Sequence, residues 1–487
     1  MDRCNLIAVK ANDNVSLSSR RVKMRSRRLA KALCLLLCTS MVSSGCVYTA
    51  LADSTEKDQA SSIEECTITF TYWGSGAEQA AIEASLKTFH EAYPQITVNA
   101  IHIPSEDFLT KINSMIAAGE SPDISYSASW KCQFGKEGLI YNFYDFAKED
   151  PDLDPDNYID TCWWKWSETE SAGPIMANVC PSLMYNKDIV DAAGIEVPTL
   201  YKNAWSWDEF VDAAQQLTLD NKGRNAKDPE FDANNIAQYG VMFAPSWNTY
   251  MSFVYSNGGG YLNEDGTEFG LCDDASAEVL QNFADLINVY HVAPTSIASN
   301  SMPSAATAIA SGQTAFYIDG SWNHLDLSEA DCNWGVGCLP IDSNYTTYLD
   351  GGSLIVFKST QHLDATLALY KWITDPESSD EITEMFRTIW MPVQKVYYED
   401  PDKLQFWASE DLPARPKGFQ DACVTSVIDN LTVATEINVV NFNEIDTLVS
   451  SALDEVWTGS KTAKDAMTDI KSQVDPLVEG TYNGERS

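Results

Sequence analysis

Four tryptophans follow short apolar runs that predict strands, in positions where burial is least assured. They are Trp73 after ITFTY, Trp130 after PDISY, Trp247 after YGVMF and Trp322 after AFYIDG. An indole at a strand end can pack against the apolar C–H face of a pyranose ring, whose hydroxyl groups then need polar partners nearby. The alternative for each ring is structural, either a cap on the core or a filler of the surface.

Small and polar residues stand beside these rings. Gly74, next to Trp73, would let the backbone approach a ligand closely. Glu78 opens the following helix, where it either accepts hydrogen bonds from ligand hydroxyls or lies in solvent as an ordinary helix-start acid. Gly352 and Ser353 could present backbone amides to a ligand, although glycines at a hinge need no ligand at all.

The sequence shows no pattern of catalytic residues. Its five histidines lack the H-E-x-x-H spacing, and neither G-x-S-x-G nor G-x-x-x-x-G-K-[ST] occurs. Pairs of carboxylates arise by chance among so many acids, so they give no specific support for a glycosidase. The acidic run EDPDLDPDN has Pro155 and Thr161 where a calcium loop needs Gly and Glu. We therefore expect no enzyme, no cofactor and no metal site.

The charge of the chain is lopsided. The sequence has 487 residues, enough for two or three domains, and from Cys46 onward its 23 basic and 68 acidic residues give a net charge of −45. Such a surface repels phosphate backbones, so we expect no nucleic acid as a partner. It also resists non-specific association, and we expect a monomer.

The first 45 residues predict a targeting segment. A basic stretch begins at Met24, which is an alternative start of the chain, and it precedes an apolar run over 32–42 that is too short to span a bilayer. Ser43-Ser44-Gly45-Cys46 resembles the lipobox of bacterial lipoproteins, although Ser43 replaces the usual Leu. We expect lipidation of Cys46, with residues 46–66 as a flexible tether. The alternative is a secreted protein cleaved near Gly45.

The later cysteines carry no metal or redox motif. They are Cys66, Cys132, Cys162, Cys180, Cys272, Cys332, Cys338 and Cys423, and none forms C-x-x-C. Cys332 and Cys338 flank a predicted strand and would lie too far apart to bond. Export permits disulfides, but the spacing does not reveal the pairing. We expect most of these side chains to be buried hydrophobes.

Strands and helices alternate in the first part of the chain. ITFTY, ITVNAI and PDISY predict three strands, and they are separated by amphipathic helices over 77–93 and DFLTKINSMIAAG. This β-α-β-α-β order predicts an α/β domain with a largely parallel sheet. Ligands of such sheets bind at the carboxyl ends of the strands, which places the loops after Tyr72 and Tyr126 at the site.

The second part continues with similar elements. Ser206 and Glu209 form the pattern of a capping box before a helix. YGVMF, QTAFYID, WGVGCLP and GGSLIVF predict strands, and HLDATLALYKWIT predicts an amphipathic helix. The segment 454–474 is predicted helical with a break at Gly459-Ser460.

The order of these motifs resembles that of a known family. YWGSG, AYPQITV, KINSMIAAGESPDI, LMYNKDIV, WSWDEF, AFYIDGSW, WGVGCLP, GGSLIVF and EVWTGSKTAKDAM occur in the order seen in the extracellular sugar-binding proteins of bacterial ABC importers. This family, the family 1 solute-binding proteins, includes maltose-binding protein. The resemblance covers the chain from Thr67 to about Val474.

The resemblance implies a two-lobed α/β fold, periplasmic-binding-protein-like of type II, with a hinge and a ligand cleft between the lobes. The expected N-terminal lobe is 67–180 plus 341–377, and the expected C-terminal lobe is 181–340 plus 378–476, followed by a tail at 477–487. The chain would cross between lobes near 178–184, 338–352 and 375–380.

The resemblance also implies which residues meet the ligand. Trp322 would stack on a sugar ring, Ser127 and Ser129 would lie in a ligand loop, and Trp390 in IWMPVQ would lie at the cleft. With the strand-end candidates, the predicted ligand contacts are Trp73, Gly74, Glu78, Ser127, Ser129, Trp130, Trp247, Asn248, Asp319, Trp322, Gly352, Ser353 and Trp390.

The function that follows is capture of a carbohydrate, of oligosaccharide size, and its delivery to ABC permease subunits by a protein held by lipid on the outer face of the membrane. The alternative is a secreted carbohydrate-active enzyme or a surface protein that adheres to glycans. The segment CWWKW at 162–166 is either an aromatic rim for a longer glycan or an inserted loop that packs on itself.

Overall fold

The computed structural model describes residues 63–299, 301–341, 344–349, 351–434, 439, 441–479 and 481. All the elements below belong to one compact unit that begins at Glu65. The predicted targeting segment, Cys46 and most of the tether lie outside the described residues, as does most of the predicted tail. Among the described residues, none of the helices combines the length and the apolarity that crossing a membrane requires.

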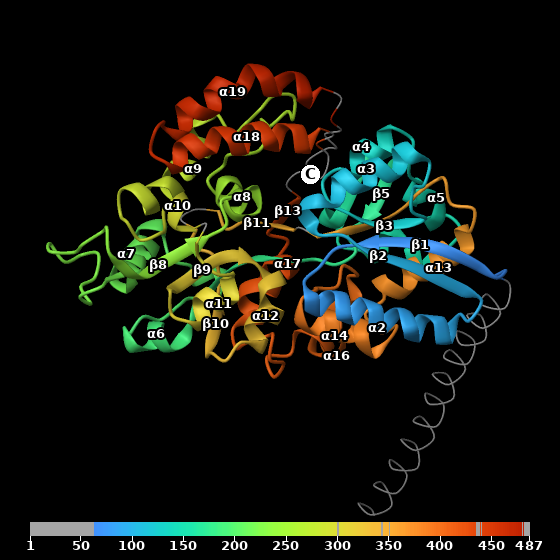
Figure 1. The fold of residues 1–487 in the computed structure, drawn as a ribbon, viewed down its shortest axis with the longest axis horizontal. Coiled ribbons are helices and arrows are strands. Elements are labelled where there is room, and N and C mark those ends of the chain that lie inside the picture. The colour runs from blue at the N-terminus through green and yellow to red at the C-terminus, as the bar shows by residue number, and fades with distance from the viewer. Residues whose placement is uncertain are drawn as a thin grey trace, which may run out of the picture. The chain divides into compact units, whose positions relative to one another are not determined.

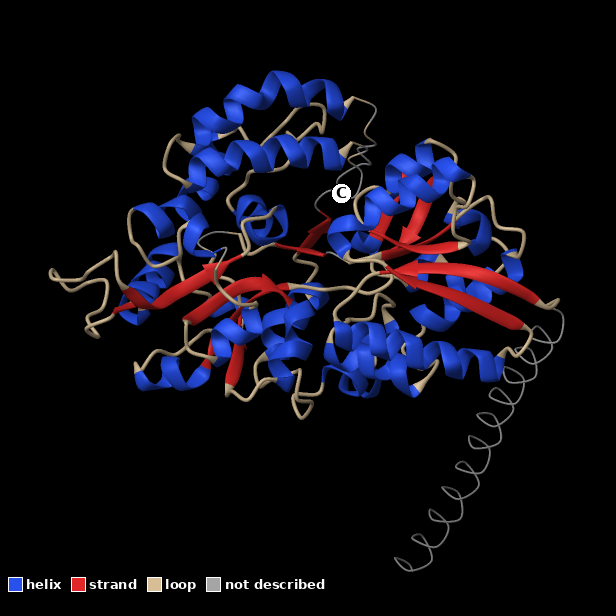
Figure 2. Ribbon diagram, viewed as in Figure 1, coloured by secondary structure: helices blue, strands red, loops and turns tan. Residues whose placement is uncertain are grey.

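The first sheet has the strand order β12–β3–β1–β2. Strands β1 (Cys66–Tyr72), β2 (Ile96–His102) and β3 (Ile124–Ser127) run parallel, and β12 (Ser353–Val356) pairs antiparallel with β3. The expectation of a largely parallel sheet is confirmed. Helices lie on both sides of these strands (Figure 2).

Local sequence signals explain where the first helices begin and end. The Ser75 side chain caps α2 (Gly76–Ala92) by accepting a hydrogen bond from the Glu78 backbone N–H. Helix α3 (Phe108–Ala118) ends at Gly119, whose φ of 72° is the left-handed conformation that glycine adopts without strain. Both helices bury one apolar stripe, as their spacing predicts.

The second sheet has the order β10–β6–β9–β8–β7. Its central strands are β6 (Pro181–Asn186) and β9 (Thr314–Gly320), which pair antiparallel, while β8 (Ile236–Phe243) runs parallel to β9. Strands β7 (Leu219–Asp220) and β10 (Trp334–Gly337) form the edges. The predicted capping box of Ser206 and Glu209 is present at the start of α7 (Trp207–Leu217).

Helices complete the layers around both sheets. Their bounds are α4 Lys131–Lys136, α5 Phe143–Ala147, α6 Lys187–Ala192, α8 Trp247–Ser256, α9 Asp274–Asn288, α10 Ser296–Ser299, α11 Ala305–Ala310, α12 His324–Glu329, α13 Leu363–Thr374, α14 Asp380–Thr388, α15 Val396–Glu399, α16 Pro401–Ala408, α17 Thr425–Ile428, α18 Phe442–Trp457 and α19 Ala463–Val478. The predicted break at Gly459 separates α18 from α19, and this glycine has a φ of 69°. Short strand pairs are β4 Trp163–Ser167 with β5 Glu170–Pro174, and β11 Thr347–Leu349 with β13 Thr432–Ala434.

Helix α14 packs with the first sheet, contrary to the expected lobe boundary at residue 378. Ser379 and Glu381 are within hydrogen-bonding distance of Ser85 and Thr88 on α2, at 3.3 Å in each case. Figure 1 shows α14 beside α2. The chain reaches the second sheet only near Gly418, where an added Cβ would lie 2.3 Å from Thr199 Cγ2. The expected crossing at 375–380 is therefore wrong, because a break between helices does not tell which sheet the next helix covers.

Ile341 and residues 344–349 belong with the second sheet, contrary to their expected place in the N-terminal lobe. Tyr345 and Tyr348 are buried in the core formed by β6, β8, β9 and the helices around them. The Tyr348 backbone N–H donates to Ser252 Oγ at 3.3 Å. The middle crossing therefore falls between Leu349 and Ser353, at the end of the expected range.

The CWWKW segment is packed within the first lobe rather than exposed as a rim. Trp163, Trp164 and Trp166 are all buried, with Trp164 only 1% exposed. The Lys131 ammonium lies 3.0 Å from the centroid of the Trp164 ring, and a Cβ on Gly135 would collide with Trp166. Neither expectation describes the segment fully: the exposed rim is wrong, and residues 163–167 form strand β4, paired with β5, whose rings pack on α4 and α5 rather than on the segment itself.

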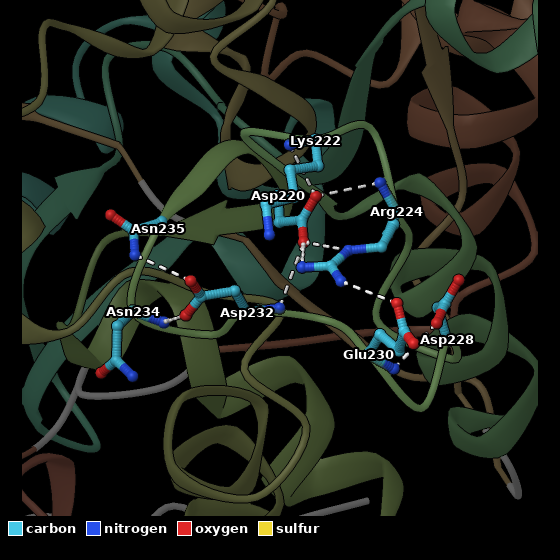
Figure 3. A network of polar contacts seen from close by, with 8 residues as sticks. All are labelled: Asp220, Lys222, Arg224, Asp228, Glu230, Asp232, Asn234 and Asn235. Atoms are coloured by element: carbon cyan, nitrogen blue, oxygen red, sulfur yellow. Dashed lines mark hydrogen bonds and ion pairs between the residues drawn. The ribbon is translucent and has the colours of Figure 1, made fainter.

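The loop between β7 and β8 is organised by one buried carboxylate. Asp220, 2% exposed, accepts hydrogen bonds from Arg224 Nε at 2.8 Å and from the backbone N–H groups of Lys222, Arg224 and Asp232 (Figure 3). Burial alone would raise the pKa of Asp220, but these hydrogen bonds hold it well below its usual range. The carboxylate thus ties together both ends of a polar loop.

Replacing Asp220 by alanine is expected to loosen residues 221–235. Trypsin should then cleave after Lys222 and Lys227 several-fold faster in the native protein, as followed by limited proteolysis and mass spectrometry. Since the folded pKa of Asp220 is depressed, its contribution to stability is present at neutral pH and is lost as pH falls below about 3.8. The matched control is Glu230→Gln, an exposed acid with one contact at 3.4 Å. Equal cleavage of the two variants would contradict this role.

Candidate functional site

Four predicted ligand contacts meet at the carboxyl ends of β1 and β3. Ser353 pairs with Ser127 across the strands, and a Cβ added to Gly352 would lie 3.1 Å from Trp73 Cζ2 and 3.8 Å from the Ser127 carbonyl. The Trp73 ring remains partly exposed. Since these residues come from three different strands, the sheet edge rather than any one loop assembles this part of the site.

An aromatic cluster surrounds Trp73. Its ring lies edge-on to Phe108, Tyr126 and Trp130, with centroids 4.8, 5.1 and 6.1 Å away. Among the described residues, the buried Tyr126 hydroxyl and the Trp130 indole N–H have no hydrogen-bond partner. Buried polar groups are rarely left unpaired, so we expect these two groups to meet a polar ligand or water.

Glu78 holds a carboxyl group against the turn that follows β1. A Cβ added to Gly74 would lie 2.5 Å from Glu78 Oε2, so only glycine leaves room for this arrangement, and Gly74 has a φ of +148°. Burial raises the pKa of Glu78 to about 8, against hydrogen bonds from the Ser75 backbone and the Trp390 indole. The carboxyl group can therefore donate as well as accept a hydrogen bond near neutral pH. Trp390 is itself buried, and we expect it to influence the site by orienting the Glu78 carboxyl group.

The second sheet presents a matching acid and tryptophan at the end of β9. Asp319 accepts a hydrogen bond from Asn323 Nδ2 at 3.0 Å and another from the Trp322 indole. Burial raises the pKa of Asp319 to about 6, against these hydrogen bonds and one from the Gly320 backbone. The Trp322 ring folds over Gly320, where any Cβ would collide with it, and stays partly exposed.

Trp247 and Asn248 begin α8. The Trp247 ring packs against Tyr348 and Phe442, with centroids 5.6 and 5.4 Å away, and it is only partly buried. The Asn248 carbonyl accepts a hydrogen bond from the Tyr348 hydroxyl. Both residues therefore lie where the second core meets α18.

Hydrogen bonds between side chains of the described residues link the lobes at two places. The Ser129 hydroxyl lies 3.0 Å from Asn443 Oδ1 on α18, and the Thr161 and Thr432 hydroxyls lie 3.3 Å apart. Ser129 was predicted as a ligand contact, and the structure places it at the junction of the two halves. Asn443 was not predicted, because polar residues on an amphipathic helix look like its solvated face.

A second residue of α18, Asp446, was also missed. It lies one helical turn after Asn443 and therefore on the same face of α18. Among the described residues, its buried Oδ1 and the buried hydroxyl of Tyr250 have no hydrogen-bond partner. Burial raises the pKa of Asp446 to about 6, and the Asp446 carboxylate contributes to a raised pKa of Tyr250. We expect Asp446 to contact the ligand together with the predicted residues.

Replacing Asp446 by asparagine is expected to stabilise the unliganded protein at neutral pH. The folded pKa of about 6 exceeds the unfolded value of 3.8, so the ionised carboxylate disfavours folding as pH rises from about 4 to 6. The variant should gain about 1–3 kcal/mol in the free energy of unfolding at pH 7.5 and nothing near pH 4, measured by urea titration. Glu444→Gln, an exposed acid on the same helix, should change little at either pH. An equal gain at both pH values would count against a buried carboxylate.

The predicted residues thus form two groups, one in each lobe. Trp73, Gly74, Glu78, Ser127, Ser129, Trp130, Gly352, Ser353 and Trp390 gather in the first, while Asp319 and Trp322 lie at the second sheet and Trp247 and Asn248 at the start of α8. Two surface pockets of the second lobe are lined by none of these predicted residues. One, of about 410 Å³, is lined by Trp205, Asp208 and Asp212, and a smaller one by Trp207 and Phe253. Within the described part of the chain, no cluster of His, Cys, Asp and Glu is arranged to hold a metal ion.

The sequence of this chain is similar to those of known binding proteins. The family model described as bacterial extracellular solute-binding protein matches residues 84–414. A binding protein of Brucella abortus is 21% identical over 403 residues, which cover 81% of this chain and 88% of the relative.

Solved structures share the fold of this chain. The ABC substrate-binding protein of Listeria monocytogenes in complex with cycloalternan has a TM-score of 0.71 at 22% identity, covering 84% of this chain and 98% of that one. The GacH receptor of Streptomyces glaucescens, solved unliganded and with acarbose, has a TM-score of 0.68 at 18% identity over 85% and 99%. UgpB of Mycobacterium tuberculosis, in complex with glycerophosphocholine, has a TM-score of 0.67 at 17% identity over 84% and 98%. The expected two-lobed fold is confirmed.

Proposed function

Because the chain belongs to the bacterial extracellular solute-binding proteins, we propose that it captures a carbohydrate of oligosaccharide size between its lobes and delivers it to an ABC permease. One observation carries the proposal. Unpartnered buried polar groups and aromatic rings occur together at Tyr126, Trp130, Tyr250 and Asp446, on elements that the Ser129–Asn443 contact joins.

The chemistry of these groups suits a sugar. Indole faces pack on the C–H faces of pyranose rings, and the hydroxyl groups between them need both donors and acceptors. The site offers donors at Tyr126 and Trp130, and carboxyl groups at Glu78 and Asp446 that can accept hydrogen bonds. A ligand that satisfies groups from both lobes stabilises the closed form over the open one, which is how binding becomes a signal to a permease.

Export and anchoring complete the proposal. The matched family is extracellular, and lipidation of Cys46 would hold the protein on the outer face of the cell membrane. The protein acts as a monomer that binds without turnover, as its relatives of known function are binding proteins rather than enzymes.

The test is isothermal titration calorimetry of residues 65–487, the compact unit that holds every described element. The titrants are mono- and oligosaccharides of different linkages, with glycerophosphocholine as a non-sugar solute. Chromatography of each sugar after the titration detects turnover.

We expect stoichiometric binding of an oligosaccharide that is recovered unchanged. Hydrolysis of the sugar would favour the alternative of a secreted carbohydrate-active enzyme. Binding of glycerophosphocholine alone would keep the transport role and reject the carbohydrate. Weak binding to many glycans without a preferred length would instead favour a surface protein that adheres to glycans.

A further inference from the structure

Two buried thiols lie together where the lobes are joined. Cys180 ends the first crossing segment, and Cys423 lies in the helical turn 420–424 that follows the third crossing. They are 2% and 0% exposed. The turn 420–424 packs against β6, which follows Cys180 directly, and the Cys423 thiol lies beside the Cys180 thiol and the Ser182 hydroxyl. The sequence separates these cysteines by about half the length of the chain, so no spacing rule could pair them.

Their backbone positions are firmly held. The Cys180 backbone N–H donates to Ser321 Oγ at 3.2 Å, and the Ser321 backbone N–H donates to the Cys180 carbonyl at 2.9 Å. On the other side, Phe419 packs against His324, with ring centroids 5.9 Å apart. The Cys180 backbone is thus fixed to Ser321 at the end of β9, and the residue before the turn of Cys423 packs against α12.

We propose that Cys180 and Cys423 form a disulfide bond in the exported protein, which fastens the first crossing segment to the segment that follows the third. The bond would close a loop that holds most of the second lobe together with β12 and α13–α16 of the first. Long loops gain the most when the unfolded chain is constrained. Extracellular compartments are where structural disulfides form and persist.

The reaction needs an oxidant, and a small or protein disulfide supplies it. With oxidised glutathione, the Cys180 thiolate attacks one glutathione sulfur and releases one glutathione thiolate. The Cys423 thiolate then attacks the Cys180 sulfur of this mixed disulfide and releases the second. Two protons leave the cysteines, and two electrons reduce the glutathione disulfide.

Oxidation is expected during folding rather than afterwards. Burial raises the pKa of the Cys423 thiol well above its ordinary value, which keeps the thiolate scarce in the folded protein. An oxidant also has no access to side chains this deeply buried. A protein folded in the reducing cytoplasm would therefore keep both thiols, and one folded after export would lose them.

The experiment is to refold reduced residues 65–487 from urea with reduced and oxidised glutathione. Free thiols are then blocked with N-ethylmaleimide in urea, and tryptic peptides are mapped by mass spectrometry. We expect one linked peptide pair, Cys180 with Cys423, and six blocked thiols of the eight. The midpoint of thermal unfolding should rise by on the order of 5 °C and return to its reduced value once the protein is unfolded and refolded with dithiothreitol.

Three variants serve as controls. Cys180→Ala and Cys423→Ala should each keep all seven remaining thiols free, while Cys162→Ala, at another buried cysteine, should still form the link. The proposal fails if the unmutated chain refolds with eight blocked thiols, if glutathione stays attached to Cys180 or Cys423, or if another pair of cysteines is joined. Mapping the unmutated chain decides the question even if a variant does not fold.

Discussion

Replacing Arg415 by methionine is expected to lower the free energy of unfolding by about 3 kcal/mol or more. Arg415 is fully buried and donates hydrogen bonds to the carbonyls of Phe386 and Thr388, each at 3.0 Å, and of Trp390 at 2.8 Å. The first two carbonyls lie in the last turn of α14, where a helix has no partners of its own to offer. Methionine fills a similar volume but leaves these carbonyls without a donor.

The guanidinium also carries a charge that suits this position. Burial lowers the pKa of Arg415 to about 10, so it remains protonated at neutral pH. A cation at the C-terminal end of α14 is favoured by the helix dipole, and the ring of Phe419 lies 4.5 Å from the guanidinium carbon. Arg415 thereby holds the Trp390 backbone, and the Trp390 indole in turn binds Glu78.

Two further variants show whether the loss of stability in Arg415→Met comes from the missing hydrogen bonds or from the missing charge. Arg415→Lys keeps the charge but cannot reach three carbonyls at once, so an intermediate loss is expected. Arg387→Met removes one hydrogen bond to the Phe406 carbonyl and a contact with its ring, at a partly exposed position, and should cost about 1 kcal/mol or less. Urea unfolding followed by tryptophan fluorescence measures all three. A loss for Arg415→Met no greater than that for Arg387→Met would refute the capping role.

The fold could be predicted from the sequence wherever a local signal decides the outcome. Alternating residues predict β1 and β2, the Ser206–Glu209 capping box marks the start of α7, and Gly459 marks the break between the last helices. No local signal in the sequence marks the boundaries between the lobes. The apolar stripe of α14 requires a partner surface but does not specify which one, so its contact with α2 emerges only from the tertiary structure.

Part of the candidate site could likewise be predicted from the sequence, and part could not. Residues that follow strand ends, such as Trp73 and Ser127, could be predicted because the carboxyl ends of parallel strands meet at one sheet edge. Asn443 and Asp446 could not, since a polar residue on a helix is most often solvated. Only the structure shows that Asn443 contacts Ser129 and that an Asp446 oxygen is buried without a partner among the described residues.

Replacing Trp322 by alanine is expected to weaken binding of the preferred oligosaccharide by roughly 30- to 100-fold, with little loss of stability. The ring is partly exposed and lies over Gly320, so its removal exposes backbone without opening a cavity in the core. The loss of affinity has two sources. A stacking face disappears, and Asp319 loses the indole hydrogen bond that helps to fix its carboxylate.

Trp205→Ala is the matched control, because this partly buried tryptophan of the same lobe packs on Phe316 and lines the pocket near Asp208 instead. Calorimetry should show unchanged affinity for Trp205→Ala and the large loss for Trp322→Ala. Adding Asp319→Asn to Trp322→Ala then tests whether the indole and the carboxylate act as one unit. If they do, the double variant should bind scarcely more weakly than Trp322→Ala alone, since neighbours that share a contact do not contribute additively. Equal affinity of Trp322→Ala and the unmutated chain would remove β9 from the site and leave ligand capture to the first lobe and α18.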